Sequence, residues 1–599
     1  MMENNNNNNN INNNDTGIHN HHRPRRPSSD TITYLRGLPL DSEVAHAEVT
    51  RFVTASSLSN QEEERDDHDE DDSNDMEFPQ SVAAALSALG EITQEIASLA
   101  GDEQGSQSLE VITRIVAPYS ELASRILLNS CKGYYFHLAT HRYGSHVLQT
   151  ILQLSNTNTN TNTHALDLAL HEEAPPSLRE EHDTTALPSL YDLLVGVVEE
   201  LTPHLTELAT HLCGSHVVRT LLCVLGGVSL EASAFDKYKN TSIRGKTKNK
   251  KKKKKKKPSS SDEDGSASLG NNAGSMSIVY IENPIITPSR FLPTLEAFSQ
   301  ALLVGGSDDS NETNEPGELQ QQACHASAGP LLIVLIRVLT YSASAESESA
   351  TAAQKEDSML KQKQKDSSKT KAKAKTIDND NTDTTTTFGG KLIPNPTNQP
   401  IADFRLGILK SEPRYTTNSL ADRAVKRILC WQNNDNGNDG KEQEHASDVI
   451  YGLSGEPRGS HVLETIMRLC PDEFYQSLLH YGNFIGAASS TNNNTDTDND
   501  TAMQEYVAHN VSNFVIQTML STIRNQEQAK QVLTTIIRTV ISNGIALDSS
   551  KKRRGILWRA TELAAKYCLE EQQQEIVTAI HQGFLAITAA TATATTTTS

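Results

Sequence analysis

The chain has 599 residues and a net charge of −21, and only 36% of its residues are hydrophobic and 5% aromatic. One compact core of that size would need more apolar surface, so the composition argues against a single globule. No apolar stretch approaches the roughly 20 residues of a membrane span and no signal peptide opens the chain, so we expect no membrane association. Seven cysteines without a CxxC pair fit a reducing compartment with reduced, mostly buried thiols.

Low-complexity segments divide the chain, because polar tracts cannot bury enough apolar surface to fold. Folded repeats are expected between these segments, over 84–227, 277–341 and 401–585. In chain order, we expect disorder in an N-terminal region with an acidic tract (1–83), an insert (155–186), a Lys-rich linker (228–276), a second linker (342–400), two inserts (432–446 and 487–503) and a Thr-rich tail (586–599).

The tetrapeptide Gly-Ser-His-Val occurs three times, at 144–147, 214–217 and 459–462. Each copy continues with a second apolar residue, a variable polar residue and a threonine, and a looser fourth copy runs from Ser512 to Thr518. A constant framework around a varying polar position is typical of repeat proteins, which present an extended binding surface.

Apolar residues at spacings of one, three and four follow each copy, which predicts a helix that buries one broad face. The first and last polar residues of a copy lie four apart, so both project from one side of that helix with a ring beside them. Two hydrogen-bonding groups and one stacking group suit recognition of an unstacked RNA base. The candidate residues are Ser145, His146 and Gln149; Ser215, His216 and Arg219; Ser460, His461 and Glu464; and Asn513, Phe514 and Gln517.

Four stretches, Leu138–Thr150, Gly459–Thr465, His509–Gln517 and Arg553–Arg559, resemble the RNA-facing helices of Pumilio (PUF) repeats. The last contains Arg-Gly-Ile-Leu-Trp-Arg, which is similar to the closing segment of the nucleolar branch of that family, the nucleolar protein nine type. The resemblance implies an all-α fold, an armadillo-like α-solenoid of degenerate Pumilio repeats with long disordered inserts. It further implies single-stranded RNA binding in the nucleus and nucleolus during small ribosomal subunit biogenesis, near the 3′ end of the small-subunit rRNA and its spacer.

By the reading rule of that family, the first copy should favour adenine, the third guanine and the fourth uracil. The chemistry is direct for Glu464, because its carboxylate accepts hydrogen bonds and guanine offers the N1–H and N2–H donors. Two repeats depart from the pattern: Arg219 replaces the usual Gln or Glu, and Gly329 and Pro330 occupy reading positions without a side chain that can read a base edge.

Positive charge is local in this acidic chain, at Lys250–Lys257 and Lys551–Arg554. Phosphate binding depends on local potential, so an acidic total does not exclude RNA. We interpret both runs as nuclear or nucleolar import signals, and we expect Arg554 and Arg559 to contact phosphate. The expected partners are pre-rRNA of the small subunit and small-subunit assembly particles, with the chain itself a monomer.

Two other functions remain open. The repeats could be an armadillo-type protein-binding scaffold whose histidines only pack, or those of a cytoplasmic Pumilio-type regulator of messenger RNA. His137 and His141 are four apart, as in helical metal sites, but no third ligand accompanies them, so we expect no metal and no cofactor. Trp558 is interpreted as a core residue of its helix. No nucleotide-binding, nucleophile-elbow or metalloprotease motif is present, so the sequence predicts no enzyme.

Overall fold

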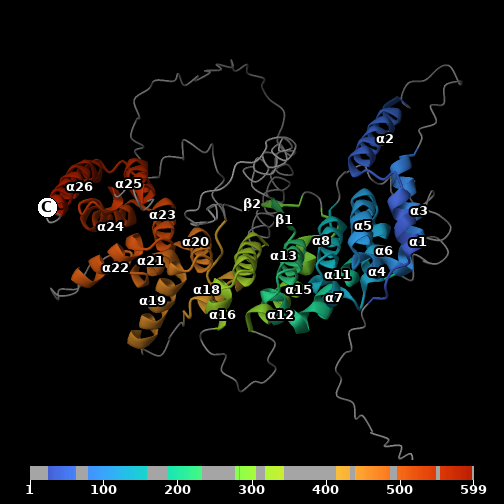
Figure 1. The fold of residues 1–599 in the computed structure, drawn as a ribbon, viewed down its shortest axis with the longest axis horizontal. Helices are drawn as coiled ribbons and strands as arrows, with labels where there is room; N and C mark the ends of the chain where they lie inside the picture. The colour runs from blue at the N-terminus through green and yellow to red at the C-terminus, as the bar shows by residue number, and fades with distance from the viewer. Residues whose placement is uncertain are drawn as a thin grey trace, which may run out of the picture. The chain divides into compact units, whose positions relative to one another are not determined.

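The computed structural model of the chain is built almost wholly of helices (Figure 1). It divides into two compact units, Met1–Ser155 with Asn162–Leu201, and Asn156–Thr161 with Thr202–Ser599. The structure describes residues 24–62, 78–157, 187–231, 277–281, 284–304, 318–342, 413–431, 439–485, 496–547 and 553–596.

The first unit is a stack of helices in which α5 packs against both α3 and α8. Side chains cap several of its helices, as expected at N-caps. For example, Asp102 accepts hydrogen bonds at the start of α5, and Ser120 Oγ accepts one from the amide of Ala123 at 3.2 Å at the start of α6. The elements are α1 (Ser29–Gly37), α2 (Ser42–Glu62), α3 (Gln80–Ile92), the 3₁₀ turn η1 (Thr93–Glu95), α4 (Ile96–Ala100), α5 (Glu103–Val116), α6 (Glu121–Cys131), α7 (Tyr135–Thr140), α8 (Gly144–Ser155) and α11 (Leu190–Leu201).

The second unit is also a stack of helices: α20 packs on α19 and α23, and α25 packs on α23 and α26. Its helices up to α18 are η2 (Thr202–His204), α12 (Leu205–Thr210), α13 (Gly214–Leu225), α15 (Pro288–Val304), α16 (Glu318–Cys324), the helix Ala328–Ser342 and α18 (Leu420–Ile428). The later ones are α19 (Asp439–Gly455), α20 (Gly459–Leu469), α21 (Asp472–Tyr481), α22 (Asp496–Ala508), α23 (Ser512–Thr522), α24 (Gln526–Ile536), the π-helical turn η3 (Ile537–Ile541), the 3₁₀ turn η4 (Ile545–Leu547), α25 (Arg554–Lys566) and α26 (Glu570–Thr596).

One small β-ribbon interrupts the helices of the second unit. Its strands β1 (Val228–Glu231) and β2 (Ser277–Tyr280) pair antiparallel with Val228 opposite Tyr280. The chain enters β1 from α13 through Gly227, whose φ of +64° is a conformation that favours glycine. These four-residue strands form the one sheet among the described residues, so the expected all-α solenoid is confirmed.

Several segments expected to be disordered contain regular structure. Helices α1 and α2 lie within 1–83 and bury Leu35, Ala45 and Val49, and both pack on α5. The low apolar content of 1–83 as a whole concealed these two short amphipathic stretches. The expected 228–276 linker begins with β1, the inserts at 432–446 and 487–503 end in the starts of α19 and α22, and α26 extends to Thr596 within the expected tail. Most of 155–186 and 342–400 lies outside the described residues.

No single helix in the described ranges is long and apolar enough to cross a membrane. The pair Glu318–Cys324 and Ala328–Ser342 passes the length and composition criteria only when taken together, and it is bent by 101°. Leu331, Leu332 and Leu335 of that pair are 0–1% exposed within the repeat core.

Candidate nucleic-acid interface

Four of the repeat helices begin at a turn that is closed by a histidine, whereas α20 has no side-chain cap. His141 Nδ1 lies 3.4 Å from the amides of Tyr143 and Gly144 and accepts hydrogen bonds from them at the start of α8. The same contacts recur at 3.1–3.4 Å at the starts of α13, the helix Ala328–Ser342 and α23, where the accepting residues are His211, His325 and His509. A side chain that accepts from these first amides satisfies donors that the helix leaves unpaired.

These capping histidines were missed from the sequence, although a histidine three residues before a glycine, alanine or serine was visible there. His141 was instead weighed as half of a metal site with His137. The two rings lie 5.9 Å apart, and no group of three potential metal ligands occurs in the part of the chain that the structure describes.

The first residue of α8, α13 and α20 is a glycine, which allows each of these helices to approach the helix before it. A Cβ at these positions would lie closer to the neighbouring backbone than nearly all real Cβ atoms do, and a backbone cannot rotate away. The distances from such a Cβ to the carbonyl oxygen six residues earlier are 3.1 Å for Gly144 and Leu138, 3.2 Å for Gly214 and Leu208, and 2.8 Å for Gly459 and Leu453.

The first residue of each candidate triplet is buried, which contradicts the expectation that a repeat presents two hydrogen-bonding groups at its surface. Ser145, Ser215 and Ser460 are 1–2% exposed, and each Oγ lies 3.1–3.5 Å from the carbonyl oxygen three residues earlier, to which it donates. Asn513 is equally buried, and its Nδ2 donates to the carbonyls of His509 and Asn510 at 3.1 and 2.7 Å. These side chains close the turn, and contact with RNA stays a prediction for them.

The second residue of each triplet faces outward. His146 and His216 are exposed, the His461 side chain is 32% exposed, and Phe514 is half-buried. Four flat rings therefore stand at the surface at equivalent places on α8, α13, α20 and α23, as stacking on a base requires.

The third residues of the four triplets differ in burial and in the hydrogen bonds that they make. Gln149 Nε2 donates to the Ser145 carbonyl at 2.9 Å, which leaves the amide oxygen facing away from that bond. Arg219 is 8% exposed and its Nε donates to the Ser215 carbonyl at 3.2 Å, and burial lowers the pKa of its guanidinium. The structure therefore places this arginine inside the repeat, away from the reading surface that the sequence assigned to it.

Glu464 and Gln517 are held differently again. Glu464 is 14% exposed, and its buried Oε1 has no hydrogen-bond partner among the described residues, lying 3.6 Å from His461 Nδ1. Gln517 Nε2 donates to Asn513 Oδ1 at 3.1 Å, and its amide packs on Gly555, where a Cβ would come within 2.1 Å of Oε1. Glu464 thus has an acceptor already desolvated and unpaired beside an exposed ring.

The closing helix α25 presents Arg554 at the surface and holds Arg559 in an ion pair with Glu562 at 2.7 Å. Trp558 is 49% exposed, so its interpretation as a core residue was wrong. Its neighbours one turn away, Arg554 and Glu562, are polar, and this composition could have indicated a solvent-facing side. Lys551, Lys552 and the run Lys250–Lys257 lie outside the described residues.

A separate groove of about 580 Å³ opens between α12 and α16. It is lined by Pro203, His204, Thr206, Glu207, Thr210, Glu318, Gln321, Gln322 and His325. None of the candidate reading residues lines it, so it is not part of the surface described above.

A helix, a turn and a second helix with an outward ring recur along both units. This repeat defines the class of the protein, an α-solenoid of Pumilio repeats. A family described as the NOP9-like PUF repeat domain matches residues 97–393 and 341–597. These matches cover more than half of the chain, and the chain belongs to this family.

Relatives with an established name include two proteins called Nucleolar protein 9. The one from Candida albicans (strain WO-1) is 30% identical over 156 residues, which are 24% of this chain and 21% of that protein. The one from Candida dubliniensis (strain CD36) is 26% identical over 283 residues, 45% of this chain and 35% of that protein. The chain thus matches about a fifth to a third of the length of these relatives. Their name agrees with the nucleolar localisation expected from the sequence.

The chain is also similar to solved structures. One is APUM23 with GGAUUUGACGG, at 14% identity and a TM-score of 0.44, with coverage of 89% of this chain and 66% of that one. Another is the RNA-binding domain of yeast Puf5p bound to SMX2 RNA, at 9% identity and a TM-score of 0.36, with coverage of 84% of each chain.

Proposed function

We propose that this chain is a single-stranded RNA-binding protein of the nucleolus that acts in small ribosomal subunit biogenesis. Its RNA would be pre-rRNA, bound near the 3′ end of the small-subunit rRNA and its spacer, within small-subunit assembly particles. We propose that it acts as a monomer and without enzymatic activity. Membership of the NOP9-like PUF repeat family supports the proposal.

The observation that carries the proposal is the recurrence of an exposed ring beside a variable polar side chain at the start of successive helices. A protein-binding scaffold has no need of a ring at this position in several repeats, whereas an unstacked base has a face to stack and an edge to read. His461 beside Glu464, whose Oε1 accepts no hydrogen bond from the described residues, is the most complete example.

Competition binding with single-stranded RNAs that differ at one base would test the proposal. The combined variant His146→Ala, His461→Ala and Phe514→Ala should bind RNA much more weakly, because stacking contributes roughly 1–3 kcal/mol per base. Equal affinity of the wild type and the triple variant would refute the RNA-binding function.

The cellular part of the proposal has its own test. Depletion should raise the level of small-subunit precursor RNA and leave the large subunit nearly untouched, and a tagged chain should accumulate in the nucleolus. Removal of Lys250–Lys257 should weaken that accumulation. A wholly cytoplasmic chain at normal expression would favour the messenger RNA regulator instead.

A further inference from the structure

The groove between α12 and α16 lies within the second unit and is lined by one face of each helix. Thr206 and Thr210 lie four residues apart on α12, and Glu318 and Gln322 lie four apart on α16, so each pair shares one helical face. The volume of about 580 Å³ is within the range of roughly 300–1,000 Å³ that is usual for ligand sites. The groove can therefore hold a large side chain with part of its main chain.

One residue of the groove is buried, and it is polar. Gln322 is 9% exposed, and its side-chain amide makes no hydrogen bond within the described ranges. In three other repeats the residue three positions before the capping histidine is apolar or aromatic and 0–2% exposed, as Leu138, Leu208 and Tyr506 show. Because burial of an unpaired amide is unfavourable, this glutamine indicates a ligand that enters the groove and pairs with it.

Two carboxylates and an imidazole also line the groove. Glu207 comes from α12 and Glu318 from α16, and both are exposed and form no ion pair in the part of the chain that the structure describes. His325 Nδ1 accepts hydrogen bonds from the amides of Ser327 and Ala328 at 3.2 and 3.4 Å. The proton of the neutral ring is therefore on Nε2, which is a donor. The groove thus offers negative charge from both helices, one amide and one N–H donor.

This set of groups fits a basic peptide better than RNA. The two carboxylates repel phosphate, and no lysine or arginine is among the described residues that line the groove. A guanidinium presents five N–H donors in one plane, so it can donate to Glu207 and Glu318 together. The amide of Gln322 both donates and accepts, as the peptide main chain does.

We propose that this groove binds an arginine-bearing segment of a partner protein. The guanidinium lies between Glu207 and Glu318, and the Gln322 amide pairs with the main chain next to the arginine. The site goes beyond RNA binding, because it uses none of the candidate reading residues. The chain can therefore hold a protein and an RNA at the same time.

Selection from a phage-displayed library of random dodecapeptides, performed with the full chain, tests the groove. The wild type should enrich peptides that contain arginine, and the double variant Glu207→Gln, Glu318→Gln should not. A synthetic copy of the most enriched peptide should bind the double variant at least about tenfold more weakly, the effect of losing charged acceptors. Citrulline in place of its arginine should cause the same loss with the wild type and no further loss with the double variant.

The double variant Glu296→Gln, Glu575→Gln is the matched control. It removes the same charge from exposed positions of the same unit outside the groove. This control should keep both the arginine enrichment and the affinity for the peptide. All variants should show a cooperative thermal unfolding curve.

Gln322→Leu separates a role in binding from a role in packing. It introduces the leucine that two other repeats have at this position and removes an unpaired buried amide, so the unfolding temperature should stay equal or rise. Affinity for the enriched peptide should nevertheless fall about tenfold, because the main chain of the peptide loses its partner.

Several results would overturn the proposal. These are a wild type that enriches no arginine-bearing peptide, equal enrichment by the wild type and the groove double variant, an equal loss in the control, and unchanged peptide affinity in Gln322→Leu. If the groove double variant changed the affinity for single-stranded RNA but not for the peptide, the groove would bind RNA and the proposal would also be wrong. None of these results involves the stacking rings, so the proposed RNA-binding function would stand.

Discussion

The glycine at the start of α8, α13 and α20 lets the backbones of two neighbouring helices come close together. At Gly459, a Cβ would lie 2.8 Å from the carbonyl oxygen of Leu453 and 3.0 Å from its Cα. Neither atom can rotate away, so α20 must shift from α19 to accept a methyl group. We expect Gly459→Ala to lower the free energy of unfolding by about 1–3 kcal/mol in urea.

Gly452 provides the control on the neighbouring helix α19. It is exposed, and nothing lies within 4 Å of a Cβ built there. Gly452→Ala should raise the free energy of unfolding by about 0.5–1 kcal/mol, because alanine loses less backbone entropy in a helix. Effects of the same sign at both positions would contradict the close-approach argument.

The buried serine of a repeat has a structural role that can be separated from base reading. Ser460 Oγ donates to the Pro457 carbonyl at 3.1 Å and is covered by the fold, whereas Glu464 lies beside the exposed ring. We expect Ser460→Ala to lower the free energy of unfolding by about 0.5–1.5 kcal/mol and to keep the guanine preference of that repeat. If Ser460→Ala lost the guanine preference in competition binding, the serine would have to contribute to base reading.

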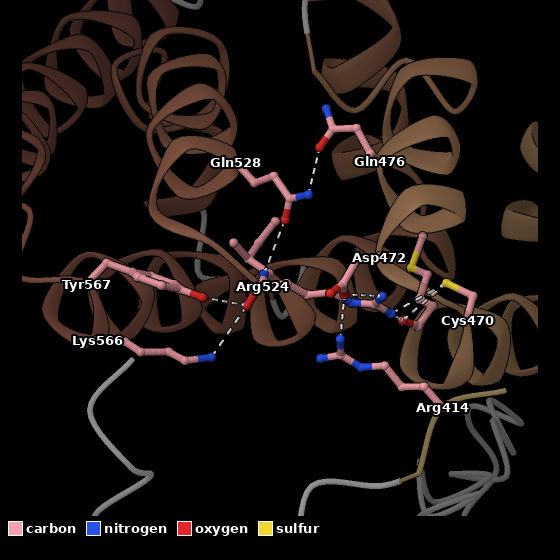
Figure 2. A network of polar contacts seen from close by, with 10 residues as sticks. Arg414, Cys470, Asp472, Gln476, Arg524, Gln528, Lys566 and Tyr567 are labelled. Carbon is pink, nitrogen blue, oxygen red and sulfur yellow. Dashed lines mark hydrogen bonds and ion pairs between the residues drawn. The ribbon is translucent and has the colours of Figure 1, made fainter. Parts of the chain in front are cut away.

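At the scale of elements, a polar cluster joins α20, α21, α23 and α25 (Figure 2). Its centre is Arg524, in the turn after α23, whose Nη1 lies 2.8 Å from Asp472 Oδ1 at the start of α21. Nη2 donates to the carbonyl of Met467 at 3.0 Å, and the guanidinium lies 4.2 Å over the ring of Tyr475. Figure 2 shows that a second arginine, Arg414, reaches the same carboxylate oxygen of Asp472.

The two arginines differ in burial, and this difference predicts different contributions to stability. The side chain of Arg524 is 5% exposed and that of Arg414 is 43% exposed. Arg524→Ala removes a buried hydrogen bond and a stacked ring contact, so it should lower the free energy of unfolding by about 2–3 kcal/mol. Arg414→Ala removes a solvent-screened ion pair and should change it by less than about 1 kcal/mol. If urea titrations of the two variants showed similar losses of the free energy of unfolding, the shared Asp472 carboxylate, not burial of the arginine, would determine each contribution.

The sequence predicted these elements where its signal was periodic. The Gly-Ser-His-Val copies indicated α8, α13 and α20 because apolar spacing and a glycine can be recognised without knowing any contact. Helix α5 was not recognised as similar to them, since Gly-Ser-Gln-Ser-Leu-Glu lacks the histidine and one valine. Its similarity lies in contacts: Gly105 approaches Leu99 as Gly459 approaches Leu453, and Asp102 accepts a hydrogen bond from the Gly105 amide. The burial of Ser145 and the exposure of Trp558 were also missed. The helical period shows on which face of a helix a residue lies, but it does not show how far neighbouring helices cover that face.

At the scale of the whole molecule, both units contain buried thiols. The structure has seven free cysteines, of which Cys131 in the first unit and Cys223 and Cys470 in the second are buried, while Cys568 is exposed. The thiolate is the reactive form of cysteine and must also be reached by a reagent. In the native chain at pH 8, mass spectrometry after iodoacetamide treatment should find Cys568 labelled and these three buried cysteines labelled only after unfolding.

The same thiols predict how stability depends on pH. Burial raises the pKa of Cys131 and Cys223 from 9.0 to about 12, and burial, partly opposed by Arg524, raises the pKa of Cys470 to about 11. Between pH 9 and these values the unfolded chain releases protons that the folded chain retains, so unfolding becomes more favourable as the pH rises. Below pH 9 both states hold the protons and these groups have no effect.

We therefore expect the free energy of unfolding to fall between pH 9 and 11, with each buried thiol contributing a slope of up to about 1.36 kcal/mol per pH unit. Buried tyrosines add the same sign above pH 10, since burial raises the pKa of Tyr567 to about 12. Urea unfolding at a series of pH values would measure the slope. Cys223→Ala should make the slope shallower between pH 9 and 11 and leave the slope below pH 9 unchanged. An unchanged slope in that variant would mean that Cys223 ionises alike in the folded and unfolded chain, and that its burial does not limit stability at alkaline pH.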